Sequence, residues 1–341
     1  MALAASKNRW PILIADPDYA GSIPEVAAQF GNMELVCANE THSALALASG
    51  GEFIGLVAQS TPVDRSLLAA LPNLRVVLKV GRNYYNIDAP TVRERGLIFA
   101  AAPRKGPNCV AELALTLILA LSKDLLISHQ STADGHYRQR GLHPEHTSQR
   151  KHAFRWMQNM RVHEVSGKTL GLVGLGEING ELARRASVMG MHTLYYKRKP
   201  LTPELERCFL AEYRDLNTLL QKSDYVCLAL PLTPETEKII GRDELALMKP
   251  GAYLINVARG GVVDEEALIE ALAQQCIAGA GLDVFTFEPL PADSPLGRLN
   301  NVILTPHIGG GTGSSRTLEL SEALAELERI LSGQSPRVNL S

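Results

Sequence analysis

Three side chains that could move a proton and hold an anion lie in the second half of the sequence. They are Arg259, Glu288 and His307, in the stretches Asn256-Val-Ala-Arg-Gly-Gly, Phe287-Glu-Pro and Thr305-Pro-His-Ile-Gly-Gly. An imidazole can transfer a proton near neutral pH, a carboxylate can fix the orientation of the ring, and a guanidinium matches the shape of a carboxylate. These residue types predict acid/base chemistry on an anionic substrate.

Each of these side chains follows a predicted strand, as does Asp283 in Gly281-Leu-Asp-Val-Phe. Ligands of open α/β sheets bind outside the carboxyl ends of the strands, so we expect the four groups to converge. Each also has a purely structural alternative. His307 could be a loop histidine with satisfied hydrogen bonds, Glu288 a turn residue before proline, Arg259 a surface cation and Asp283 a helix or turn cap. Their joint occurrence favours a site.

A glycine-rich turn earlier in the chain predicts a dinucleotide site. The segment Thr169-Leu-Gly-Leu-Val-Gly-Leu-Gly-Glu-Ile-Asn-Gly180 joins a buried strand to an amphipathic helix. Gly174 permits the tight turn, and Gly176 lets the backbone approach a pyrophosphate at the positive end of the helix. Asn179 stands where a third glycine is expected, with Gly180 beside it. A methyltransferase or a tight packing turn could show a similar motif, but the surrounding strands and helices favour a dinucleotide.

The residues after the second strand of this region indicate which dinucleotide binds. Lys197 lies 197 − 174 = 23 positions after Gly174, close to where an NAD site places an Asp or Glu on the ribose 2′-hydroxyl. Lys197 and Arg198 stand there instead, and two cations attract a 2′-phosphate. We therefore predict that NADP(H) is preferred over NAD(H). The alternative is a solvated basic loop that only relaxes the discrimination.

Taken together, the motifs resemble the D-isomer-specific 2-hydroxyacid dehydrogenases, which include the glyoxylate/hydroxypyruvate reductases. The resemblance rests on Gly-Lys-Thr-Leu-Gly with the glycine turn, Asn-Val-Ala-Arg-Gly-Gly-Val-Val-Asp-Glu, Leu-Asp-Val-Phe followed by Glu-Pro, and Thr-Pro-His-Ile-Gly, and it fades in residues 128–165. It implies that His307 is the general acid/base, that Glu288 binds the far side of the imidazole, and that Arg259 pairs with the substrate carboxylate or carbonyl.

The same resemblance implies NAD(P)H-dependent reduction of a 2-oxo acid to a D-2-hydroxy acid, or the reverse, without a metal ion, in a homodimer built through the cofactor domains. Hydride transfer to the carbonyl creates an alkoxide that a protonated imidazole can quench. The implied dinucleotide-binding residues, with Asp283 on the nicotinamide carboxamide, are Gly174, Gly176, Glu177, Ile178, Lys197, Arg198, Pro231, Val257, Ala258, Arg259, Asp283, His307 and Gly309. A formate- or phosphite-type dehydrogenase and a non-catalytic, dinucleotide-sensing corepressor remain alternatives.

The predicted substrate-binding turn departs from the family pattern. The family has Gly-x-Gly before Asn-Ile-Asp, with backbone N–H groups that hold the substrate carboxylate, whereas this chain reads Gly81-Arg-Asn-Tyr-Tyr-Asn-Ile-Asp88. Asn83 can still adopt a left-handed conformation. We expect Gly81, Arg82 and Asn83 to bind substrate together with Arg259 and His307. Because Arg82 and the two tyrosines add charge and bulk, the expected substrate is a larger or more anionic acid than glyoxylate.

The order of predicted elements places these residues in an α/β fold of two doubly wound parallel-sheet domains with a cleft between them. Strand patterns at 12–15, 35–38, 54–58, 76–80 and 97–101 form a smaller, flavodoxin-like substrate domain, and those at 169–173, 193–196, 225–230, 253–257, 280–285 and 302–305 form a Rossmann domain. A helix over 314–331 is expected to return to the first domain. The predicted domains are 1–122 with 312–341, and 123–311.

Residues 128–165 form a polar insertion in this scheme. It contains His129, His136, His143, His146, His152 and His163 among Arg138, Arg140, Arg150, Lys151 and Arg155. A metal site is one interpretation, but the histidine spacings match no helical pair and no carboxylate cluster accompanies them. The pattern favours a solvated or cleft-covering segment.

The composition narrows the possible partners. A chain of 341 residues suits two domains, and 34 basic against 36 acidic residues favour neither nucleic acid nor a membrane surface. The longest apolar stretch, 113–121, falls short of the roughly 20 residues that span a bilayer. Five scattered cysteines have no Cys-x-x-Cys spacing, which argues against a disulfide framework or a zinc site. We expect a cytoplasmic protein that acts on a small acid.

Overall fold

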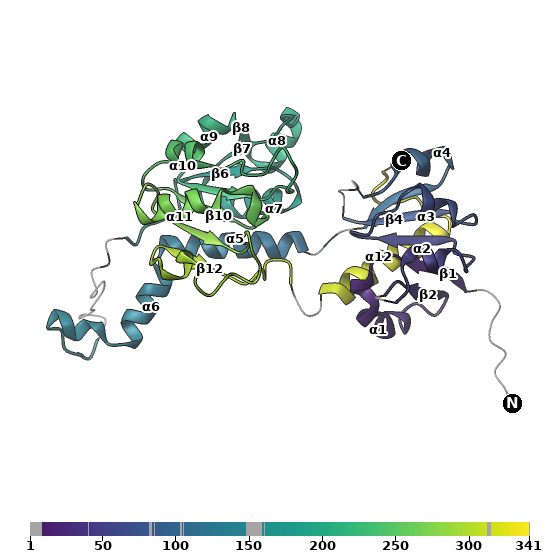
Figure 1. Ribbon diagram of the computed structural model, residues 1–341, viewed down its shortest axis with the longest axis horizontal. Coiled ribbons are helices and arrows are strands. Elements are labelled where there is room, and N and C mark those ends of the chain that lie inside the picture. Colours follow the sequence, from purple (N-terminus) through teal and green to yellow (C-terminus); the bar gives the residue numbers. More distant parts are fainter. Residues whose placement is uncertain are drawn as a thin grey trace. The chain divides into compact units, whose positions relative to one another are not determined.

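The computed structural model describes residues 9–39, 41–81, 84, 86–102, 104, 106–147, 159, 161–311 and 315–340. The chain divides into two compact units, Met1–Lys105 with Thr312–Ser341 and Gly106–Gly311, and each is built around one parallel sheet (Figure 1). The predicted α/β class with two doubly wound sheets is confirmed. Within the described ranges, no helix has the length and apolar character needed to cross a membrane.

The first unit has a five-stranded sheet in the order β2-β1-β3-β4-β5, which is the flavodoxin-like order. The strands are β1 (Trp10–Ile14), β2 (Met33–Cys37), β3 (Gly55–Ala58), β4 (Val76–Val80) and β5 (Ile98–Ala102). One face packs against α2 (Ala44–Ala48), α3 (Arg65–Ala69) and α4 (Ala89–Glu94). The other packs against η1 (Pro17–Ser22), α1 (Ile23–Ala27) and α12 (Ser315–Leu331). The C-terminal helix therefore contributes one apolar face to the core of the first unit.

The second unit has a seven-stranded sheet in the order β12-β11-β10-β9-β6-β7-β8. Its strands are β6 (Thr169–Val173), β7 (His192–Tyr196), β8 (Ala211–Tyr213), β9 (Tyr225–Leu228), β10 (Tyr253–Asn256), β11 (Gly279–Leu282) and β12 (Val302–Leu304). The order reverses between β6 and β9, where a dinucleotide binds in a Rossmann sheet. Strand β8 was not predicted, because three residues are too few to establish an alternating pattern.

The helices of the second unit either precede β6 or connect these parallel strands. They are α5 (Gly106–Ser122), α6 (Leu125–Ala133), α7 (Glu177–Val188), α8 (Pro203–Phe209), α9 (Leu216–Lys222), α10 (Arg242–Leu247) and α11 (Glu265–Ala273), with short 3₁₀ turns η2 (His136–Arg140), η3 (Gly260–Val262) and η4 (Pro295–Arg298). Since the helices run back against the strands, the start of α7 and the loops after the strands meet at one edge of the sheet.

Helix α5 belongs to the second unit, whereas the predicted boundary after residue 122 placed it in the first. The helix packs against α7, β10 and β11 and buries Ala111, Ala114, Leu117 and Ile118. Gly281 on β11 permits the close approach, because a Cβ there would lie 3.0 Å from the Cβ of Leu117. The run of apolar residues predicts that the helix is buried but does not tell which sheet covers it.

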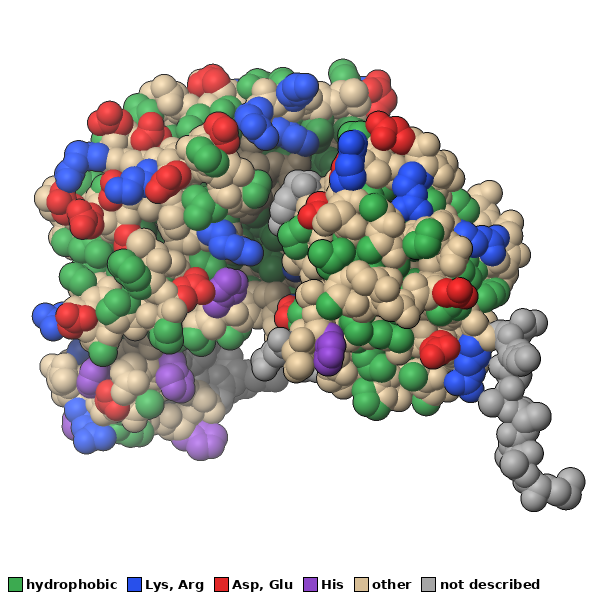
Figure 2. All heavy atoms as spheres, turned by 45° about the vertical axis from the view of Figure 1, so that its right-hand side comes forward, with side chains coloured by type: hydrophobic (Ala, Val, Ile, Leu, Met, Phe, Trp, Pro, Cys, Tyr) green, Lys and Arg blue, Asp and Glu red, His purple; other side chains and the backbone are tan. Residues whose placement is uncertain are grey.

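A projecting segment follows α5, and we call residues 125–147 the arm. It contains α6 and η2, neither of which buries a residue, and it extends away from the sheet of its unit (Figure 1). Histidine side chains gather on its surface, as Figure 2 shows. Across the described residues, no three or more His, Cys, Asp or Glu side chains are grouped to hold a metal ion. Four of the predicted basic residues, Arg150, Lys151, His152 and Arg155, lie outside the described residues.

Candidate active site

The turn after β6 has the geometry that a dinucleotide requires. Gly174 has a φ of +84°, and a Cβ there would lie 2.8 Å from the carbonyl oxygen of Ala229, so a side chain does not fit. Gly176 caps the N-terminus of α7, and no described heavy atom beyond its chain neighbours lies within 4 Å of the place its Cβ would take. The backbone is therefore open where the positive end of a helix begins, which suits a pyrophosphate.

Asn179 replaces the third glycine without disturbing this turn. Its side chain is fully buried, and its Nδ2 donates to the carbonyl oxygen of Gly174 at 2.6 Å. The close packing of the helix, which the third glycine normally permits, is found at Gly180. A Cβ there would lie 2.6 Å from the ring of Phe209. Asn179 departs from the glycine motif, but its side-chain amide links the start of α7 to the turn that follows β6.

Lys197 and Arg198 follow β7 at the same edge of the sheet. Neither side chain forms an ion pair with a residue that the structure describes. The pKa of Glu235 is lowered chiefly by the hydrogen bond from Thr233, and the charge of Arg198 adds to this effect. A basic pair without a carboxylate partner is consistent with a bound phosphate.

His307 and Glu288 form a hydrogen-bonded pair. The distance between His307 Nδ1 and Glu288 Oε2 is 2.6 Å, and the second carboxylate oxygen, Oε1, accepts from the N–H of Phe285 at 3.1 Å. Because an ionised carboxylate can only accept, Nδ1 carries the hydrogen and Nε2 is left for another partner. The His307 side chain is 44% exposed, so the ring is accessible.

The carboxyl group of Glu288 is held in its charged form. Burial raises its pKa, but the hydrogen bonds from His307 and Phe285 and the positive charges of His307 and Arg259 outweigh burial, so the pKa lies below its ordinary value. Arg259 therefore lies near enough to act electrostatically on the pair. The three residues that the sequence selected are brought together at one place.

Asp283 holds the loop that carries His307. Its Oδ1 accepts from the hydroxyl of Thr305 at 2.6 Å and from the N–H of Ile308 at 2.9 Å, and its Oδ2 accepts from the N–H of Gly309 at 2.9 Å. The side chain is only 2% exposed. These bonds hold His307 at a φ of +54°, which is unfavourable for a residue other than glycine. The turn cap that the sequence left as an alternative for Asp283 is present in the structure.

Arg259 is positioned by two neighbours in its own loop. Asn256, which is 2% exposed, accepts from the N–H of Ala258 at 3.0 Å and donates to the carbonyl oxygen of Arg259 at 3.1 Å. A Cβ on Gly260 would overlap the backbone carbonyl of Phe285, so only glycine lets this loop touch the loop that leads to Glu288. Asn256 and Gly260 were not predicted as site residues, and their position beside Arg259 is the only signal for them.

The remaining residues predicted to bind the dinucleotide lie at the same edge. Val257 and Ala258 are buried after β10, Pro231 follows β9, and Glu177 and Ile178 begin α7. At Gly309 a Cβ would lie 2.9 Å from the Asp283 carboxylate, so the Asp283 contacts depend on this glycine. All the residues predicted to bind the dinucleotide therefore lie at the carboxyl edge of the second sheet.

The predicted substrate turn lies in the first unit and is described in part. Gly81 has a φ of +88°, and its N–H donates to the carbonyl oxygen of Ala102 at 2.9 Å. Arg82 and Asn83 lie outside the described residues, as does Tyr85. Tyr84 packs edge-on against Phe99 in the core, with ring centroids 5.3 Å apart. Its bulk faces the core of its own unit, which differs from the expectation that both tyrosines crowd the substrate.

Comparison with known proteins decides the family. The profile for "D-isomer specific 2-hydroxyacid dehydrogenase, NAD binding domain" matches residues 115–309, more than half of the chain. The chain belongs to this family. The D-isomer-specific 2-hydroxyacid dehydrogenases are oxidoreductases that use a nicotinamide dinucleotide, as the sequence motifs implied.

The sequences of known relatives align with most of the length of this chain. A glyoxylate reductase of Thermococcus gammatolerans is 42% identical over 269 residues, which cover 79% of this chain and 75% of that protein. A glyoxylate/hydroxypyruvate reductase B of Pectobacterium carotovorum subsp. carotovorum is 38% identical over 295 residues, which cover 86% and 85%. The apo structure of D-mandelate dehydrogenase from Rhodotorula graminis matches with a TM-score of 0.70 and 28% identity over 98% of each chain.

The lowered pKa of Glu288 predicts a pH-dependent contribution to stability. A carboxylate whose pKa is lowered by folding stabilises the folded chain above the pKa of the unfolded state, and this stabilisation is lost as the pH falls through the folded pKa. We expect Glu288→Gln to lower the thermal midpoint at pH 7, and the difference from the native protein to narrow below pH 4.5, the ordinary value for this group.

Thermal unfolding between pH 3 and pH 8, followed by circular dichroism, measures this difference. The matched control is Glu237→Gln at an exposed position of the same unit, which should leave the midpoint unchanged. Equal midpoints for Glu288→Gln and the native protein at pH 7 would contradict the stabilising role of the pair.

Proposed function

We propose that this dehydrogenase reduces a 2-oxo acid to a D-2-hydroxy acid with NAD(P)H, and that Arg259, Glu288 and His307 are its catalytic residues. The observation that carries the proposal is the 2.6 Å bond between His307 Nδ1 and Glu288 Oε2, with the charge of Arg259 close by. Relatives named for the reduction of glyoxylate and hydroxypyruvate support it. They do not favour the formate- or phosphite-type dehydrogenase, nor the corepressor.

The open turn at Gly176 and the basic pair Lys197 and Arg198 fit a dinucleotide, and the bound dinucleotide supplies the hydride. Arg259 holds the carboxylate of the oxo acid through its planar guanidinium. As the carbonyl is reduced, negative charge develops on its oxygen, and His307 donates a proton to it from Nε2. Glu288 keeps the ring oriented through Nδ1 and stabilises its protonated form.

The dinucleotide-binding role of the residues at the carboxyl edge is part of the same proposal. Asp283 uses both carboxylate oxygens within the chain, but Oδ2 accepts only the N–H of Gly309 there and can accept a second hydrogen bond from the nicotinamide carboxamide. For the substrate side, we propose that Gly81, Arg82 and Asn83 bind the carboxylate and that the acid is larger or more anionic than glyoxylate. The similarity to a mandelate dehydrogenase fits a bulky acid.

A panel of 2-oxo acids assayed through NADPH absorbance tests the activity. We expect His307→Ala to lower kcat by about 10²- to 10⁴-fold, because it removes the proton donor. Arg259→Ala should lower kcat/KM by at least about tenfold, because a charge-assisted pair with the substrate is lost.

Both variants should still bind the dinucleotide, which fluorescence titration of NADPH measures. Turnover of His307→Ala at the native rate would refute the mechanism. If glyoxylate reacts faster than every larger acid in the panel, the proposed substrate size is wrong while the reaction class stands.

The preference for NADP(H) rests on Lys197 and Arg198. We expect the double substitution to glutamine to weaken NADPH binding by about 10- to 100-fold and to change NADH binding little, because only NADPH carries the 2′-phosphate. Steady-state kinetics with both dinucleotides measures the ratio. Lys199→Gln, an exposed lysine one position on, is the matched control. A native protein that prefers NADH would overturn the preference.

We further propose a homodimer formed through the second unit, with the arm at the interface. Leu125 and Leu126 on α6 are each 53% exposed, and a partner would remove this apolar surface from water. Light scattering after size exclusion should give twice the mass of one chain, and Leu125→Glu with Leu126→Glu should give a single chain. Leu205→Glu, at an exposed leucine of α8, should leave the mass unchanged. The cytoplasmic location stays a prediction.

A further inference from the structure

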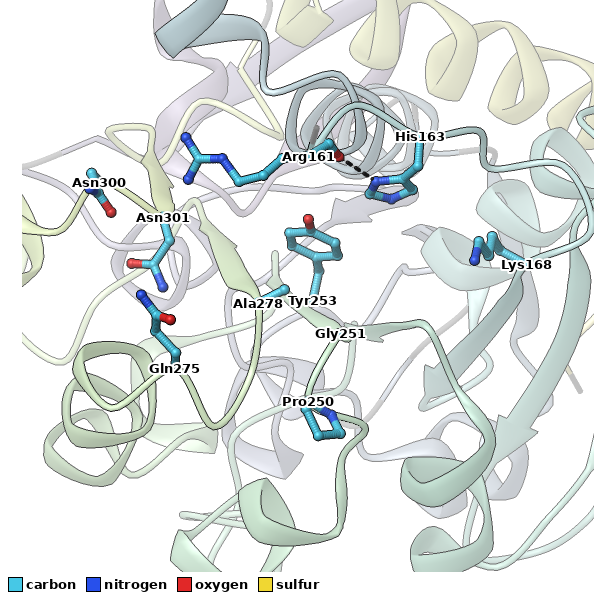
Figure 3. Close-up of a pocket in the computed structure, with 10 residues that line it drawn as sticks. All are labelled: Arg161, His163, Lys168, Pro250, Gly251, Tyr253, Gln275, Ala278, Asn300 and Asn301. Atoms are coloured by element: carbon cyan, nitrogen blue, oxygen red, sulfur yellow. Dashed lines mark hydrogen bonds between the residues drawn. The ribbon is translucent and has the colours of Figure 1, made fainter. Parts of the chain in front are cut away.

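A cavity of about 420 Å³ lies in the second unit at the edge of the sheet opposite His307. Lys168 precedes β6, Tyr253 begins β10 and Asn301 precedes β12, so the cavity faces the amino ends of the strands. Arg161, His163 and Gln275 also line it, and Figure 3 shows these side chains around the ring of Tyr253. None of the proposed catalytic or dinucleotide-binding residues takes part.

The lining of this cavity is basic. It contains Arg161 and Lys168, and no aspartate or glutamate is among its residues. Arg161 also pairs with Asp124 at 3.0 Å, which neutralises part of its charge. Asp224, at the start of the strand next to β6, already accepts from Lys249 at 2.9 Å and from the N–H of Thr169 at 2.8 Å. The ammonium group of Lys168 has no hydrogen-bond partner among the described residues and remains available.

Tyr253 adds a hydroxyl donor on a largely buried ring. The residue is 8% exposed, and its ring is stacked with His163 at 5.8 Å and with Tyr225 at 5.4 Å between centroids, which fixes where the hydroxyl points. Figure 3 shows the oxygen directed toward the main chain of Arg161 and the ring of His163, with the Arg161 guanidinium extending away from it. The structure gives this hydroxyl no hydrogen-bond partner among the residues it describes, and the oxygen is not one of the buried unpartnered polar atoms, so it is open to the cavity and free to donate.

His163 does not satisfy this hydroxyl, because both ring nitrogens are engaged. Nδ1 bonds to the carbonyl oxygen of Arg161 at 2.8 Å, and Nε2 bonds to the hydroxyl of Tyr225 at 2.7 Å. Two side-chain amides also line the cavity. Asn301 donates from Nδ2 to the carbonyl oxygen of Leu272, so its Oδ1 is left to accept from a ligand. The side chain of Gln275 forms no hydrogen bond within the described part of the chain.

We infer that this cavity binds a small soluble oxyanion, a carboxylate or a phosphate group, through Lys168, Arg161 and the hydroxyl of Tyr253. All three groups donate to negatively charged oxygen, and no acidic side chain in the lining opposes it. The amides of Gln275 and Asn301 contact the rest of the ligand. A bound anion links the segment before β6 to the starts of β10 and β12, so it stabilises the second unit.

Isothermal titration of the full-length protein, with NADPH present in excess to fill the dinucleotide site, tests this inference. Inorganic phosphate and malonate are titrated separately at constant ionic strength, so the tighter of the two identifies the group that the cavity prefers. We expect one saturable site that Lys168→Gln and Tyr253→Phe each weaken by about tenfold or more. Lys222→Gln, an exposed lysine at the end of α9, is the matched control and should bind as the native protein does.

Malonate could also occupy the site of the substrate carboxylate, so each titration is repeated in Arg259→Ala, which should retain the cavity site. Tyr253→Phe keeps the ring stack, and unchanged 2-oxo acid reduction in both cavity variants shows that they are folded. The inference is overturned if neither anion binds saturably, or if both cavity variants bind as tightly as the native protein. This outcome leaves the proposed reduction of oxo acids untouched, because the readout is binding at the opposite edge.

Discussion

The proposed catalytic arrangement depends on the hydrogen bonds of one buried carboxylate, that of Asp283. Asp283 directly follows β11, accepts three hydrogen bonds from the segment 305–309 and thereby fixes the backbone of His307 in a left-handed conformation. Such a conformation costs on the order of 1–3 kcal/mol and persists only where the surroundings determine it. His307, the proposed acid/base group, is thus held by the sheet, and its ring needs only one further bond, to Glu288, to be oriented.

The loops after β10, β11 and β12 support one another because these strands are neighbours in the sheet. Gly260 brings the loop of Arg259 against the backbone of Phe285, and Phe285 in turn donates to Glu288. The guanidinium, the carboxylate and the imidazole therefore come from three segments that share backbone contacts. A change in one loop is transmitted to the others through packing of the main chain, where little adjustment is possible.

Much of the fold could be predicted from the sequence, because its parallel strands are short apolar runs that end at glycine or at a polar residue. The bounds of β4 and β6 match the predicted ones, and the other predicted strands differ by a few residues at their ends. Helix α5 was assigned to the wrong unit because apolar side chains do not specify the sheet they cover. The three-residue strand β8 has no pattern of its own and depends on its pairing with β7.

In the candidate site, the residues with acid/base or ionic side chains could be predicted, and those that only position the loops could not. Arg259, Glu288 and His307 are recognisable by type and motif. Gly260 matters because it touches the backbone of Phe285 in another loop, and Asn256 because its side chain holds the main chain of Ala258 and Arg259. Tyr84 illustrates the same limit, since an aromatic residue beside a binding turn can face either the ligand or the core, and only its contact with Phe99 decides.

The first unit is made of two separate segments of the chain, and this affects the order in which the two units can fold during synthesis. The second unit is continuous, whereas one face of the first sheet is closed by α12, through Leu320, Leu324 and Leu327, which are translated after every strand of both sheets. The nascent first sheet therefore emerges from the ribosome with that apolar surface exposed, and the Rossmann unit can reach its native structure before the flavodoxin-like one does. The unit that begins the sequence is the last to be completed.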